Sequence, residues 1–107
     1  MTKADAAEFV AELKLKYPSP RSASSRLGGY CVGGALCLFR GHADFPFPQK
    51  WKVARVLAEM TGRREDDLQI EKAAGQILDA NDKENFVVAW IVLEDALVTE
   101  EVKDGAE

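Results

Sequence analysis

The chain has 107 residues, of which 47% are hydrophobic and 30% are charged, and its net charge is −4 at pH 7. This length predicts one domain, and this balance of apolar and charged residues excludes a wholly disordered chain. The two cysteines are too few for a disulfide framework, so we expect reduced thiols and a cytoplasmic protein. No apolar run approaches the ~20 residues that a membrane-spanning helix needs, and we expect no membrane contact.

Charge is distributed unevenly along the chain. Residues 1–64 hold eleven Lys and Arg against five Asp and Glu, whereas residues 65–107 hold three against thirteen. The first part therefore carries +6 and the second −10. Either the two parts complement each other inside the fold, or a dipolar surface pairs with a partner or with a second copy of the chain.

The N-terminal region has the pattern of an amphipathic helix. Thr2 and Asp5 have the spacing of a capping box. Apolar residues then follow at helical intervals along one face: Ala6, Phe9, Val10, Leu13 and Tyr17. Pro18 and Pro20 end this helix, and residues 18–29 are expected to form a polar loop.

The segment from Gly28 to Phe39 is the most unusual part of the sequence. It holds both cysteines and four of the eight glycines, and it contains no charged residue. Its apolar run from Tyr30 is compatible with a buried strand or a helix, and its small residues favour the helix. Because Gly33 and Gly34 lower the helix propensity by about 2 kcal/mol relative to alanine, they indicate a packing or functional reason for glycine at these positions.

Two further helices are predicted after a rigid turn at Phe45–Pro48. Pro48 suits the first position of a helix that ends at Gly62. The apolar side of this helix is predicted to hold Val53, Ala54, Leu57 and Met60, and its solvated side Lys52, Arg55 and Glu59. Asp66 or Asp67 caps the next helix. The apolar face of that helix comprises Ile70, Ala73, Ala74, Ile77 and Leu78.

The last predicted helix runs from about Lys83 to Val98, with Asn81 or Asp82 as its cap. Residues 86–93 are apolar on nearly every side, so we expect this helix to be buried on every side. Their β-branched content leaves a strand as the alternative. Residues 99–107 form an acidic tail. The whole pattern predicts a single all-α domain, a compact bundle of about five short helices with a buried C-terminal helix.

Cys31 is the candidate nucleophile of a hydrolase or transferase. At the start of a helix, the helix dipole lowers the pKa of a thiol. A nucleophilic thiol also needs a base, and the one histidine, His42, lies beyond the far end of the same helix, with Asp44 to orient it. The spacing of Cys31, Cys37 and His42 matches none of the usual zinc patterns, so we expect neither a metal nor a cofactor.

The basic N-terminal half, which includes Arg21 and Arg26, is the feature that would favour a nucleic-acid-binding regulator. The reading helix of such a protein would begin at Glu65-Asp66-Asp67, where negative charge repels phosphate, so we do not expect nucleic acid as a partner. Trp51 and Phe47 are the candidate aromatic anchors for a protein partner, and Arg21 and Arg26 are candidate charged contacts. Either aromatic ring can instead cover the core.

The segment Tyr30–Leu36, followed by Asn81-Asp82 before a helix rich in Ala, Trp and Leu, resembles a family of small uncharacterised bacterial and phage proteins. Members of this family pair a C-x-x-G-A-L segment with a later Asn-Asp. The resemblance implies a compact helical domain in which Cys31 and Gly34 allow close helix contact and Asn81-Asp82 is a helix cap. It implies no catalytic residue. Because no catalytic constellation is complete and the two parts of the chain carry opposite charge, we expect a non-enzymatic module that binds another protein or itself.

Overall fold

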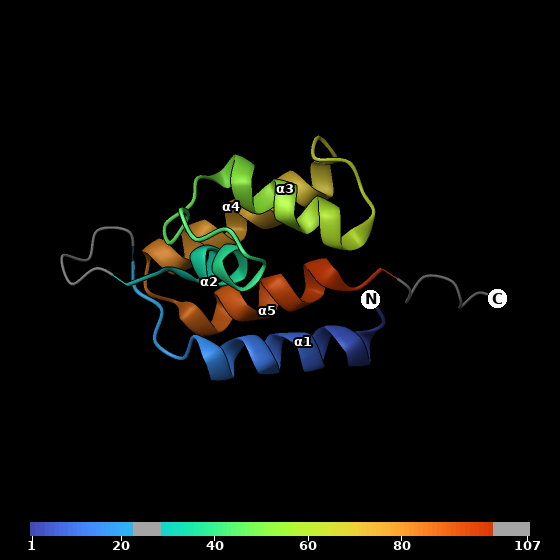
Figure 1. The fold of residues 1–107 in the computed structure, drawn as a ribbon. Helices are drawn as coiled ribbons and strands as arrows, with labels where there is room; N and C mark the ends of the chain where they lie inside the picture. The colour runs from blue at the N-terminus through green and yellow to red at the C-terminus, as the bar shows by residue number, and fades with distance from the viewer. Residues whose placement is uncertain (23–28, 100–107) are drawn as a thin grey trace.

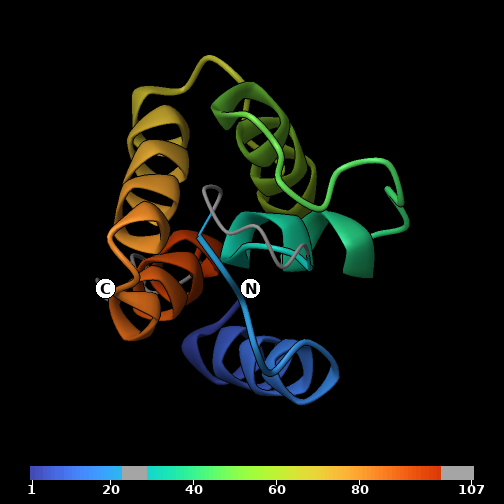
Figure 2. The ribbon, with the colours of Figure 1, turned by 90° about the vertical axis from the view of Figure 1, so that its left-hand side faces the viewer.

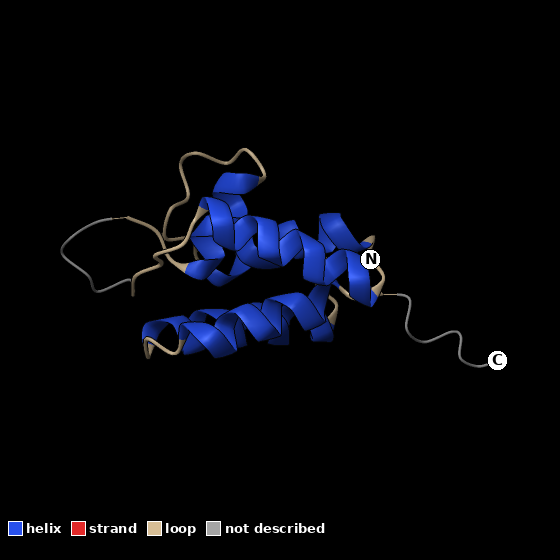
Figure 3. Cartoon of the chain, turned by 90° about the horizontal axis from the view of Figure 1, so that it is seen from below, coloured by secondary structure: helices blue, strands red, loops and turns tan. Residues whose placement is uncertain are grey.

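The computed structural model describes residues 1–22 and 29–99, which form five helices joined by loops (Figures 1 and 3). The helices are α1 (Lys3–Lys16), α2 (Val32–Phe39), α3 (Lys50–Thr61), α4 (Leu68–Asp82) and α5 (Phe86–Leu97). No strand occurs in the described ranges, so the predicted all-α bundle of five short helices is confirmed. None of these helices is long and apolar enough to cross a membrane.

The two helices with the most apolar sequences hold the bundle together. α2 and α5 each contact all four other helices, whereas α1 contacts only α2 and α5. Figure 2 shows α2 near the middle of the molecule, with α1 on one side and α3 and α4 on the other. The core therefore lies around α2 and the inner side of α5, and the largest side chains in it include Leu36, Leu57 and Leu93.

Local sequence signals set several helix ends. The Thr2 side chain accepts a hydrogen bond from the Asp5 backbone N–H, and the Asp67 side chain accepts one from Gln69. Gly62 ends α3 in the left-handed conformation, with φ of 72°, which a residue without Cβ adopts at little cost. Pro48 lies just outside α3, because Gln49 is the N-cap and Lys50 the first helical residue.

The boundary between α4 and α5 differs from the prediction. Asn81 and Asp82 belong to the last turn of α4, and Asn85 is the N-cap of α5, without a side-chain hydrogen bond. The expectation that Asn81 or Asp82 caps the last helix is therefore wrong. The apolar series of α4 continues to Ala80 and buries the last turn against the bundle, which extends the helix past the polar residues.

Two predictions of burial are also wrong. α5 is not covered on every side, since Val87, Val88 and Ile91 are exposed. Lys52 is not on the solvated side of α3, because its side chain is buried with its Nζ 4.7 Å from the centroid of the Phe45 ring. The loop before α3 thus covers a face that periodicity alone assigns to solvent. Of the predicted polar loop and acidic tail, residues 23–28 and 100–107 lie outside the described residues.

Candidate functional site

Cys31 occupies the start of α2, as predicted, but as a buried N-cap. Its Sγ accepts a hydrogen bond from the Gly34 backbone N–H at 3.2 Å, and the residue is only 2% exposed. Its own backbone N–H donates to the Pro46 carbonyl oxygen at 3.0 Å. The thiol therefore uses its sulfur to satisfy a backbone donor that the helix leaves free.

Burial sets the protonation of this thiol. Removal from water raises the pKa of Cys31, which outweighs the lowering effect of the backbone N–H groups of Gly34 and Gly33; the carboxylate of Asp82 raises it further. The expectation that the helix start lowers this pKa is wrong. Desolvation disfavours the charged thiolate more strongly than the helix end stabilises it.

The structure does not place His42 and Asp44, the predicted partners of Cys31, beside its thiol. His42 follows the other end of α2, where its backbone N–H donates to the Cys37 carbonyl at 2.9 Å, and a helix of this length spans about 12 Å. Asp44 is exposed in the following turn. Within the described ranges no hydrogen bond links Cys31 to His42, and no group of three His, Cys, Asp or Glu is arranged to hold a metal ion.

Asn81 is the polar residue that sequence reasoning placed wrongly. Its side chain is fully buried, and its Oδ1 accepts a hydrogen bond from the Val32 backbone N–H at 2.9 Å. Its Nδ2 donates to the Arg21 carbonyl at 3.0 Å. Asn81 is thus a cap, but of α2, across 49 positions of sequence. No local pattern reveals such a pairing; the signal is a lone amide among buried apolar residues.

The glycines of α2 allow the loop before α3 to lie against the helix. A Cβ at Gly34 would overlap the backbone carbonyl of Pro46, and a Cβ at Gly33 would lie 2.9 Å from Val53 Cγ2. Such approaches exclude any larger residue unless the neighbouring segment moves. Among the described residues, the start of α2 is therefore a tightly packed junction.

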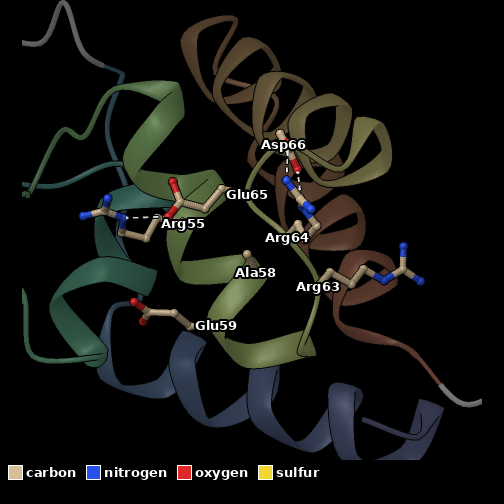
Figure 4. Close-up of a pocket in the computed structure, with 7 residues that line it drawn as sticks. All are labelled: Arg55, Ala58, Glu59, Arg63, Arg64, Glu65 and Asp66. Atoms are coloured by element: carbon tan, nitrogen blue, oxygen red, sulfur yellow. Dashed lines mark hydrogen bonds and ion pairs between the residues drawn. The ribbon is translucent and has the colours of Figure 1, made fainter.

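The charged hollow beside α3 is shown in Figure 4. It is a shallow depression of about 520 Å³, with Ala58 as its floor and Arg and carboxylate side chains around it. Arg55 pairs with Glu65 at 3.1 Å, and Arg64 pairs with Asp66 through two hydrogen bonds of 3.0 Å (Figure 4). Because these oppositely charged groups pair with each other while exposed to solvent, the hollow is a solvated charged surface.

Of the predicted aromatic and basic contacts, Trp51 is exposed, Phe47 and Arg21 are partly buried, and Arg26 lies outside the described residues. Trp51 is 50% exposed, with its ring edge-to-face against Phe45 and the Arg55 guanidinium 5.8 Å from its centroid. Phe47 is half-buried. Arg21 is held through its backbone, which donates to Tyr30 and accepts from Asn81.

The outer face of α5 carries three of the six large hydrophobic residues that are exposed on the described surface. Val87 is 69% exposed, Val88 40% and Ile91 53%. Their spacing places them within one turn of each other on one side of the helix. We call these three residues the α5 face. Leu15 and Leu68 are more exposed but lie on α1 and α4, each apart from the α5 face, and Leu15 lines a hollow on α1 with Phe9 and Ala11.

A groove between α4 and α5 lies beside the α5 face. It has a volume of about 300 Å³, its apolar lining is Ala73, Val92 and Ala96, and Lys72 and Asp95 border it. Gln69 and Gln76 complete the lining, so a mixed polar and apolar surface continues from α5 to α4. Comparison of the chain with protein-family models, with curated proteins and with solved structures finds no match in any of the three.

Proposed function

We propose that the chain is a helical module that binds another protein without catalysing a reaction, and that the α5 face is its contact surface. The observation that carries the proposal is the exposure of Val87, Val88 and Ile91 together on one helix. Contiguous apolar surface of this kind is more often an interaction site than single exposed residues are. The buried, protonated thiol of Cys31 supports binding over covalent catalysis.

The small size of the α5 face determines how much additional surface a partner must cover. Complete burial of a Val or Ile side chain contributes about 1.5 to 3 kcal/mol, so covering three half-exposed residues contributes roughly 2 to 4 kcal/mol. Association itself costs about 4 to 15 kcal/mol in lost freedom of motion. The α5 face alone is therefore too small for a stable complex, and the partner must also cover the groove between α4 and α5.

The proposal is tested by capture with matched variants. The double variant Val87→Ser/Ile91→Ser removes two of the three residues of the α5 face without adding charge, and Leu15→Ser removes a still more exposed apolar residue from α1. Tagged proteins of each kind are incubated with a lysate of the cells that make the chain. We expect a partner that the wild type and Leu15→Ser retain in equal yield and the double variant loses. Identical capture by all three proteins would refute the proposal.

Solution mass gives an independent measurement. Sedimentation of the wild type alone, at low and high salt, shows whether the α5 face pairs with a second copy. A monomer at both salt concentrations, together with no partner that depends on the α5 face, would count against a binding module.

A further inference from the structure

We infer that the outer side of α1 is a second interaction surface, and that its partner is a basic amphipathic helix, that is, a helix whose apolar stripe is bordered by Lys or Arg. This surface lies on a different helix from the α5 face, so the inference goes beyond the proposed function and does not depend on it. Three features of the described residues support it: a hollow along α1, the charge of its lining, and the charge of the helices beside it.

The hollow lies on the side of α1 that the bundle leaves uncovered. α1 contacts only α2 and α5, and Figure 1 shows it at one edge of the molecule. The hollow has a volume of about 650 Å³ and extends from Met1 to Leu15. Its apolar lining comprises Met1, Phe9, Ala11 and Leu15, and Leu15 is 84% exposed. A partner would therefore find apolar surface to cover along several turns of α1.

The charged side chains that line this hollow are all acidic: Asp5, Glu8 and Glu12. None of the three forms an ion pair with a described residue. The one cation in the lining is the ammonium group of Met1, which donates a hydrogen bond to Thr99 Oγ1 at 2.7 Å. Three carboxylates and one ammonium give the lining a net charge of −2, whereas the lining of the groove between α4 and α5 is neutral.

The lysines of α1 do not cancel this negative charge. Lys3 and Lys14 lie at least about 120° around the helix from each of the three carboxylates, so they belong to its other side. Lys16 is closer, but its Nζ lies 6.0 Å from the centroid of the Phe39 ring, and it forms no ion pair within the described part of the chain.

The helices beside α1 do not cancel it either. α2 contains no charged residue, and its C-cap is Arg40. The charged residues of α5 are Glu94 and Asp95, both acidic. The surroundings of α1 therefore add two carboxylates against one guanidinium, and the hollow remains an acidic surface.

The spacing of the carboxylates favours a helix as the partner. Asp5, Glu8 and Glu12 recur at intervals of three and four positions, which places them in a row about 10 Å long on one side of α1. Lys or Arg at the same intervals on a second helix can meet this row when the two helices lie side by side. An incoming strand would need a free sheet edge, and the described ranges contain no strand.

The same charges disfavour a second copy of the chain as the partner. Two copies that meet through this hollow would place three carboxylates against three carboxylates, which costs free energy. A basic helix instead gains from complementary charge, which speeds association and excludes acidic competitors.

The test uses three synthetic amphipathic peptides with the same leucine stripe and with Lys, Gln or Glu beside it. Titration measures Kd, and NMR shifts of the α1 amides locate the contact. We expect the lysine peptide to bind α1 at least about tenfold more tightly than the glutamine peptide, and to weaken as salt screens the charges. Binding of the glutamine or glutamate peptide that equals that of the lysine peptide would overturn the inference.

Two pairs of variants with the same change in net charge separate this surface from general attraction to an acidic protein. Glu8→Gln/Glu12→Gln removes two carboxylates of the hollow and should weaken binding of the lysine peptide at least about fivefold. Glu59→Gln/Glu71→Gln removes two exposed carboxylates from α3 and α4, helices that do not contact α1, and should change Kd by less than about twofold. Equal weakening by both pairs would contradict a site on α1.

A second matched comparison tests the apolar part of the surface. Leu15→Ser should weaken binding of the lysine peptide severalfold, because the leucine stripe loses an apolar contact. Leu68→Ser changes a leucine of α4 that is 80% exposed and should leave Kd unchanged. If Leu15→Ser has no effect, the attraction is by charge alone and the amphipathic partner is wrong.

The outcomes distinguish this inference from the proposed function. The proposed function is judged by capture through Val87 and Ile91, which none of these variants changes. A lysine peptide that shifts α5 amides in place of α1 amides would overturn the inference and leave the α5 face as the contact surface. An increase in solution mass that Leu15→Ser abolishes would identify a second copy as the partner of α1 and overturn the basic helix.

Discussion

Asn81 illustrates how one buried amide can join three segments of chain. Its carbonyl oxygen caps α2, its NH₂ group binds the Arg21 carbonyl, and no part of it reaches solvent. A buried donor or acceptor left without a partner costs about 1 to 3 kcal/mol. The residue therefore contributes to stability mainly by preventing two such losses.

Replacement of Asn81 tests this role. Asn81→Ala leaves the Val32 N–H and the Arg21 carbonyl without their partner, and we expect the free energy of unfolding to fall by about 2 to 4 kcal/mol. The control is Asn85→Ala, at an exposed cap without a side-chain hydrogen bond, which should change stability by less than about 0.5 kcal/mol. Urea unfolding measures both, and equal losses would contradict the role given to Asn81.

The glycines provide a second test at the level of single residues. Gly34→Ala forces a Cβ into the Pro46 carbonyl, so we expect a loss of at least about 3 kcal/mol or failure to fold. Gly75 lies inside α4, where a Cβ would meet Lys50 Cδ at an ordinary 3.5 Å. Gly75→Ala should therefore raise stability by about 0.5 to 1 kcal/mol. Melting temperatures that shift in the same direction for both variants would contradict the close contact at Gly34.

The buried thiol of Cys37 makes the stability of the folded protein depend on pH in the alkaline range. Burial raises the pKa of its thiol from 9.0 to about 12. Because the folded state keeps the proton longer than the unfolded state, this group favours folding below pH 9, and its contribution declines as pH rises from 9 towards 12. Cys37→Ala should be less stable than the wild type at neutral pH, with a difference that shrinks above pH 9. A difference in melting temperature that stays constant with pH would refute this.

At the scale of single elements, the sequence predicts helices well where their signals are local. The cap at Thr2, the apolar face of α1 and the cap at Asp67 each depend on residues a few positions apart, and the structure confirms them. The sequence predicts the junction of α4 and α5 at the wrong place, because a polar Asn-Asp pair is typical of a helix start. In the structure Ala80 and Asn81 are buried, and α4 continues through them.

The orientation of α5 in the bundle cannot be predicted from the periodicity of its sequence. A helix that is apolar on nearly every side carries no mark of which side the bundle covers. The structure packs α5 against the other four helices and buries Ala89, Leu93 and Leu97, whereas Val87 and Ile91 remain exposed. The candidate contact surface was therefore invisible in the sequence, which directed attention to Cys31 and Trp51 instead.

The two sides of α5 should respond differently to substitution. Val87→Ser/Ile91→Ser removes only exposed apolar groups, so we expect a change in unfolding free energy within about 1 kcal/mol. Leu93→Ala, on the buried side, should cost about 2 to 5 kcal/mol because it leaves a cavity. Chemical unfolding of both variants checks this, and a large loss for the serine variant would indicate that the outer side of α5 is needed for folding.

At the scale of the whole molecule, the uneven charge is only partly balanced within the fold. Among the described residues, the pairs Arg55–Glu65 and Arg64–Asp66 join the basic and acidic parts of the chain, but each connects positions close in sequence. Lys83 pairs with Asp79, and Asp95 lines hollows that also contain Lys72 and Arg63, but the other carboxylates of residues 79–95 form no ion pair with a described residue. A surface of this kind attracts cationic partners more strongly at low salt than at high salt.

The caps of α2 also bear on the order in which the molecule assembles. α2 has eight residues, fewer than the ~12 at which isolated helices become marginally stable. The N–H of its N-cap, Cys31, donates to the Pro46 carbonyl, and the N–H of its first residue, Val32, donates to Asn81. α4 and α5, in contrast, follow each other through a three-residue turn and meet early. We expect α2 to order late, so that Asn81→Ala speeds unfolding and leaves the refolding rate nearly unchanged in stopped-flow measurements. Slower refolding of this variant would instead place α2 in the folding nucleus.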